Sequence, residues 1–194
     1  MPRRFSIRPT LTLRGRAFKG LRGFAGKPSH PPLTDFPVAA YILAMVFDVI
    51  SIVAGDDSSI GRDFFVSATH VVIAGAAVSL LTALTGFWDW LRSTEPGTQA
   101  RRTANWHMAV MLTVTVIVLA DIALRLAQWD DGATSAAVLV LSLAAGLLVA
   151  FGAAFGGTLV FDYGFNVETA GDSPVWHPSE RDVLPGSTDP APSP

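Results

Sequence analysis

Two of the four histidines, His30 and His107, are placed where they could bind one cofactor together. His30 comes just before the first long apolar segment, and His107 lies near the start of the third, so both belong to the same end of a helical bundle. Two imidazoles from different helices at one depth are what a six-coordinate b-type haem requires. We therefore consider His30 and His107 candidate ligands of haem b, or part of a quinone site.

A structural explanation stays open for the same two residues. Asp35 and Asp89 are expected at the same end of the helical bundle as His30 and His107, and the four residues form a first polar layer. In this interpretation His30 orders the Pro-rich stretch around it, while His107 hydrogen-bonds Asp35 or Asp89 at the membrane interface. Either way, the layer predicts that His30 and His107 are neighbours.

A second polar layer is predicted toward the opposite end, from Asp48, His70, Asp121 and Arg125. Arg125 follows Asp121 by four residues, so the two share a helix face and can pair. Ionisable groups at membrane depth usually face protein and pair with one another. Two interpretations stay open: a proton or ion path through Asp48, His70 and Asp121, or an ion-pair network that fixes helix register.

The segments that must position these residues are membrane helices. Half of the 194 residues are hydrophobic, 15% are charged and mean hydropathy is +0.42, which is too apolar for an ordinary soluble domain. Four apolar segments reach the length that crosses a bilayer, at residues 36–54, 64–91, 104–127 and 133–162. We expect an all-α fold, an integral membrane four-helix bundle formed by residues 28–163, with Pro37 in the first turn of its first helix.

Charge orients this bundle. Eight of the fourteen basic residues precede residue 28, and the loop at 92–103 carries three more, which places both in the cytoplasm by the positive-inside rule. Four crossings return the C-terminus to the same side. Residues 1–27 are expected to be a disordered basic segment that contacts the anionic cytoplasmic leaflet, with no nucleic-acid partner. Residues 164–194, polar and Pro-rich, are expected to form a flexible cytoplasmic tail.

Composition also limits the chemistry. The chain has no cysteine, which excludes disulfides, thiolate metal sites and iron–sulfur ligation by its own residues. It also lacks the sequence motifs of nucleophilic hydrolases, zinc proteases and phosphate-binding loops. We predict no catalytic residue and no protein metal site.

Several of these residues belong to recognisable motifs. His30, Pro31, Leu33, Phe36, Pro37 and Asp48 resemble the opening motif of the bacterial membrane proteins grouped as domain-of-unknown-function family 2231. Gly86 with Asp89, His107, and the stretch GGTLVFDYGFNV at 156–167 are similar to that family too. The resemblance covers residues 26–167 and implies a multi-pass protein of the bacterial inner membrane.

The resemblance also implies a setting. Members of this family are sometimes joined in one chain to a Rieske iron–sulfur domain, although no activity is established for the family. Here Lys27 stands where many members carry a further histidine, and the cysteine-free tail cannot be a Rieske domain. We therefore expect a non-enzymatic module that anchors or organises a larger, respiratory or redox, membrane assembly with an iron–sulfur or other membrane partner. The alternatives are the haem- or quinone-binding subunit using His30 and His107, and ion translocation.

Overall fold

The computed structural model describes residues 20–21, 23 and 28–167. They form four α-helices, named α1 (His30–Ala54), α2 (Ser59–Ser93), α3 (Gln99–Ala127) and α4 (Ala136–Phe161). Each is long and apolar enough to cross a membrane, and the prediction of an all-α bundle with four candidate spans is confirmed. The expected terminal segments, 1–27 and 164–194, lie almost entirely outside the described residues.

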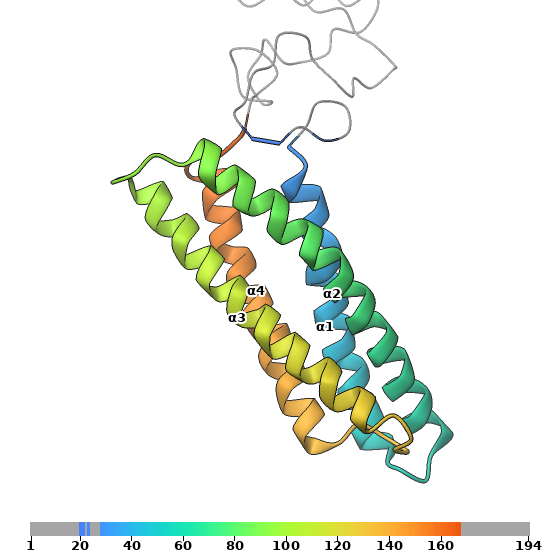
Figure 1. Cartoon of the computed structure of the whole chain (residues 1–194). Coiled ribbons are helices and arrows are strands. Elements are labelled where there is room, and N and C mark those ends of the chain that lie inside the picture. The colour runs from blue at the N-terminus through green and yellow to red at the C-terminus, as the bar shows by residue number, and fades with distance from the viewer. Residues whose placement is uncertain (1–19, 22, 24–27, 168–194) are drawn as a thin grey trace, which may run out of the picture.

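The helices run up and down in turn (Figure 1). α1 packs along α2 and α4, and α3 packs along α4, whereas α2 and α3 are the least closely packed neighbours. The bundle thus has two ends. At the histidine end α1 begins, α2 ends, α3 begins and α4 ends; at the arginine end lie the α1–α2 and α3–α4 loops.

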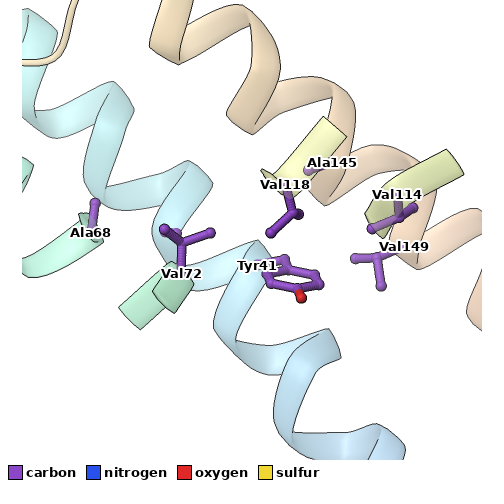
Figure 2. Packing of buried hydrophobic residues seen from close by; sticks show 8 residues of the cluster. Tyr41, Ala68, Val72, Val114, Val118, Ala145 and Val149 are labelled. Carbon is purple, nitrogen blue, oxygen red and sulfur yellow. The ribbon is translucent and has the colours of Figure 1, made fainter. Parts of the chain in front are cut away.

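The core is built from small residues one helical turn apart. Each helix contributes two buried side chains to the central cluster: Tyr41 and Ala44, Ala68 and Val72, Val114 and Val118, Ala145 and Val149 (Figure 2). The alanines let the helix backbones approach closely, which matters in lipid because burial of apolar surface no longer drives association. Large apolar side chains such as Leu84, Val116 and Leu147 point outward and are more than 60% exposed, as a lipid-facing surface requires.

Three helices begin earlier than the hydropathy pattern predicts, because polar residues extend them beyond the apolar run. α3 begins after Thr98, whose hydroxyl accepts a hydrogen bond from the Arg101 amide at 3.1 Å. α1 begins six residues before the predicted start at residue 36, with His30 as its first residue. Pro31 and Pro32 are tolerated there because the first N–H groups of a helix have no intrahelical partner.

Pro37 was predicted to lie in the first turn of its helix. It lies instead inside α1, because α1 begins earlier than predicted. It cannot donate a hydrogen bond to the carbonyl of Leu33, four residues earlier. The Thr82 hydroxyl of α2 lies 3.2 Å from that carbonyl oxygen and 3.1 Å from the Val78 oxygen of its own helix, so its proton is shared between the two. A missing backbone bond in α1 is thereby replaced by a bond between α1 and α2, close to the histidine end.

Candidate functional site

His30 and His107 face one another at the histidine end of the bundle. Their ring centroids are 6.5 Å apart and the ring planes are nearly perpendicular, at 81°. His30 comes from the start of α1, and His107 from the third turn of α3. The expectation that these two histidines are neighbours is thus met by side chains that lie 77 residues apart in the chain.

Each imidazole is held by a backbone carbonyl on the neighbouring helix. Nδ1 of His30 lies 3.0 Å from the Thr82 oxygen of α2, and Nδ1 of His107 lies 2.8 Å from the Gly152 oxygen of α4. A carbonyl can only accept, so Nδ1 must carry the proton in both rings. The other nitrogen, Nε2, then keeps its lone pair, which is the tautomer that a metal-binding histidine uses.

A glycine lies against each ring. A Cβ atom at Gly86 of α2 would come within 2.5 Å of His30 Cε1, so no larger residue fits there without moving the ring. At Gly156 of α4 a Cβ would lie 3.4 Å from His107 Cε1, in ordinary van der Waals contact, so this glycine lies against the ring without being required by it. Both glycines belong to the sequence motifs that resemble the family, so these motifs lie beside the histidine rings.

Asp89 and Asp35 differ in their surroundings. Asp89 is buried, and its Oδ1 accepts a hydrogen bond at 3.0 Å from the amide of Leu21, which precedes α1. Asp35 lies on the exposed surface of α1. The hydrogen bond expected from His107 to Asp35 or Asp89 is not formed, because His107 Nδ1 is engaged with Gly152.

The arginine end holds a buried ion cluster. Arg125 Nε donates to Asp121 Oδ2 at 2.9 Å, its Nη1 donates to Asp48 Oδ1 at 3.0 Å, and its Nη2 pairs with Asp48 Oδ2. Thr134, just before α4, also donates to Asp48 Oδ1 at 2.9 Å. The predicted pairing of Arg125 with Asp121 is confirmed, and Asp48 joins it from α1.

His70 does not join this cluster. Its side chain is exposed on α2, and its ring meets the Trp129 ring edge-on at 5.8 Å between centroids. The inward face of this part of α2 is taken by Phe65, Ala68, Thr69 and Val72. His70 therefore lies toward the arginine end, but on the outside of the bundle.

Sequence reasoning missed the groups that orient the histidines. The Thr82 and Gly152 carbonyls were not predicted as partners of the histidines, although Thr82, Gly86 and Asp89 recur at helical spacing on one face of α2. That spacing was the available signal. Within the described residues, no three His, Cys, Asp or Glu side chains come together as a metal site. A haem needs only two protein ligands, because its porphyrin supplies the other four nitrogens.

The chain was compared with protein families, curated proteins and solved structures. The model of the family described as "Predicted membrane protein (DUF2231)" matches residues 26–169, which include all four helices. No curated protein and no solved structure matches the chain. The chain is thus a multi-pass membrane protein and belongs to the DUF2231 family.

Proposed function

We propose that this protein is a redox subunit of the bacterial inner membrane, in which His30 and His107 bind one b-type haem. The observation that carries the proposal is the 6.5 Å separation of two rings whose Nε2 atoms make no hydrogen bond to any described residue. Two axial imidazoles on one iron have ring centres about 6.4 Å apart, given metal–nitrogen bonds of ~2.0 Å. The two rings thus have a separation suited to a shared ligand.

The surrounding residues support the same use. Gly86 gives the His30 imidazole space on the α2 side, and the Thr82 and Gly152 carbonyls fix the tautomer of the two rings. A hydrogen bond to Nδ1–H also increases the basicity of the coordinating nitrogen. When bound, the haem would supply one-electron chemistry; the chain's own part is to hold and orient it within the bilayer.

The second candidate is a non-enzymatic module that anchors or organises a larger membrane assembly. It is favoured by the Leu21–Asp89 hydrogen bond, which ties the segment preceding α1 to the bundle end. In this role the basic segment 1–27 contacts the anionic cytoplasmic leaflet, and an iron–sulfur or other membrane protein is the partner. The geometry gives least support to ion translocation, because His70 is exposed and Arg125 is paired with both acids.

A visible spectrum tests the haem proposal. The protein is expressed with added haem precursor, purified in mild detergent, and its reduced-minus-oxidised spectrum is recorded beside that of His30→Ala, His107→Ala and His70→Ala. We expect a sharp b-type band in the wild type and in His70→Ala, and its loss in the other two variants. A colourless wild-type preparation, or a band that survives both His30→Ala and His107→Ala, would overturn the proposal.

A further inference from the structure

A small cavity of about 110 Å³ lies between α2 and α3, away from the histidines. Its lining comes from Ala76, Ala77, Ser79 and Leu80 of α2, Thr115, Val118 and Leu119 of α3, and Tyr41 of α1. Leu80 and Leu119 are more than half exposed. Because they lie on the lipid-facing surface, the cavity opens sideways toward the hydrocarbon, between the two least closely packed helices.

One polar atom in this cavity lacks a partner. Tyr41 is 4% exposed, and its hydroxyl makes no hydrogen bond to any described residue. The hydroxyls of Ser79 and Thr115 donate to Ala76 O at 2.8 Å and to Met111 O at 2.9 Å. Ser79 Oγ could therefore only accept from Tyr41; it lies close to the tyrosine, but the pair does not meet the geometry of a hydrogen bond. A buried donor without a partner costs about 1–3 kcal/mol, so a ligand that supplies an acceptor is favoured.

The tyrosine is held in place by its packing. Its ring lies in the central cluster with Val114 and Val118 of α3 (Figure 2). On the other side, a Cβ atom at Gly75 of α2 would come within 3.0 Å of Tyr41 Cε1. The ring thus needs a glycine at position 75, and its hydroxyl cannot swing out to find an acceptor at the membrane surface.

Depth decides the kind of ligand. Tyr41 lies near the middle of α1, about 17 Å along the helix from His30. The hydrocarbon core is about 30 Å thick, so the ester carbonyls of phospholipids lie far from this level. An acceptor in mid-membrane must come with a molecule that dissolves in hydrocarbon. We propose that this cavity binds the head group of an isoprenoid quinone, with the Tyr41 hydroxyl donating to a quinone carbonyl.

The size of the cavity fits part of such a ring. A closed cavity of about 150 Å³ holds benzene, so 110 Å³ with an open side takes the carbonyl edge of a quinone while its tail stays in lipid. The proposal stands on this cavity alone and does not require haem at the histidines.

Binding of decylubiquinone tests the proposal. The protein is placed in quinone-free nanodiscs of phosphatidylethanolamine and phosphatidylglycerol and titrated, with empty nanodiscs as background. Infrared spectra of the quinone carbonyl report the hydrogen bond directly. We expect Tyr41→Phe to weaken binding about three- to tenfold and to return the carbonyl band to its frequency in empty nanodiscs.

Three controls separate the outcomes. Tyr163→Phe removes the chain's other tyrosine hydroxyl, which is exposed, and should leave affinity and band unchanged. A decyl-substituted trimethoxybenzene, which lacks the two carbonyls, should not distinguish Tyr41→Phe from the wild type. Ala77→Phe should fill the cavity and abolish binding. Equal affinity and an unshifted carbonyl band in the wild type and Tyr41→Phe would overturn the proposal and indicate a cavity for acyl chains, whatever the haem spectrum shows.

Discussion

The two ends of the bundle hold polar clusters of different design. At the arginine end the guanidinium of Arg125 donates its hydrogen bonds to the carboxylates of Asp48 and Asp121, while Asp121 Oδ1 has no hydrogen-bond partner among the described residues. At the histidine end Nδ1 of each ring bonds to a backbone carbonyl, and the Thr85 hydroxyl oxygen also lies 3.4 Å from His30 Nδ1. The first arrangement uses its charged groups to join helices, whereas in the second we propose that the two Nε2 lone pairs bind a ligand. A polar layer in a membrane bundle can thus hold helices together or bind a ligand. The hydrogen-bond partners of its side chains help to distinguish these two roles.

The largest expected effect comes from opening the closed cluster. Arg125→Met leaves two carboxylates buried without a cation and should lower the free energy of unfolding by about 3–5 kcal/mol. Thermal unfolding in detergent, followed by circular dichroism, measures the loss. The matched control is Arg92→Met, which removes an exposed arginine stacked on Trp88 and should cost less than about 1 kcal/mol.

The same cluster allows a sharper test. The triple variant Asp48→Val, Asp121→Val and Arg125→Met removes all three charges, and should unfold less easily than Arg125→Met alone because no charge remains unpaired. A triple variant as unstable as the sum of its parts would contradict a closed ion cluster.

The next effect concerns the space around His30. Gly86→Ala places a methyl group against the imidazole and should destabilise the protein by about 1–3 kcal/mol, with weakened haem binding. Gly157→Ala is the control, because its Cβ would meet nothing closer than Phe161 Cδ2 at 3.8 Å. Haem titration of the two variants would show equal affinities if the histidine end were loosely packed.

A smaller effect is expected from the hydroxyl that replaces the missing bond in α1. Thr82→Val should cost about 1 kcal/mol, because the Leu33 carbonyl loses its donor. In a Pro37→Ala background the new backbone N–H can serve that carbonyl, so Thr82→Val should cost less there. Chemical unfolding of both single variants and the double variant gives the coupling free energy, and strict additivity would argue against this account.

The smallest effect belongs to the residue that joins neither cluster. His70→Leu should change stability by less than about 0.5 kcal/mol, since its side chain already faces outward and the substitution suits lipid. Circular dichroism melts of His70→Leu and the wild type should superimpose. A loss comparable to that of Arg125→Met would place His70 in the buried cluster.

The fold was predictable because its signals are local. Each apolar run lies in a helix that is long and apolar enough to cross a membrane, and the spacing of Asp121 and Arg125 puts them on one face of whatever helix contains them. The pairing of Asp48 with Arg125 also follows from their similar depth in the membrane, because a buried arginine pairs with acidic side chains at the same depth.

The remaining features depend on information the residue types do not carry. His70 was predicted at the right end but not on the outside, because counting residues gives depth while packing of Phe65 and Val72 sets the rotation of α2. The partners of His30 and His107 are backbone carbonyls, which every residue has. The start of α1 at His30 depends on proline being acceptable in a first turn, against its usual role as a helix breaker.

The hydrogen bonds from the two histidines to backbone carbonyls each stay within one helical hairpin, either α1–α2 or α3–α4. His30 of α1 is fastened to α2, and His107 of α3 is fastened to α4, so each helical hairpin carries one ring that it orients by itself. The distance between the two ring centroids therefore depends on how the two hairpins pack against each other. If one hairpin slid along the other, the distance between the rings would change while each ring kept its hydrogen bond within its own hairpin. A ligand bound to Nε2 of both rings would hold the α1–α2 hairpin and the α3–α4 hairpin together.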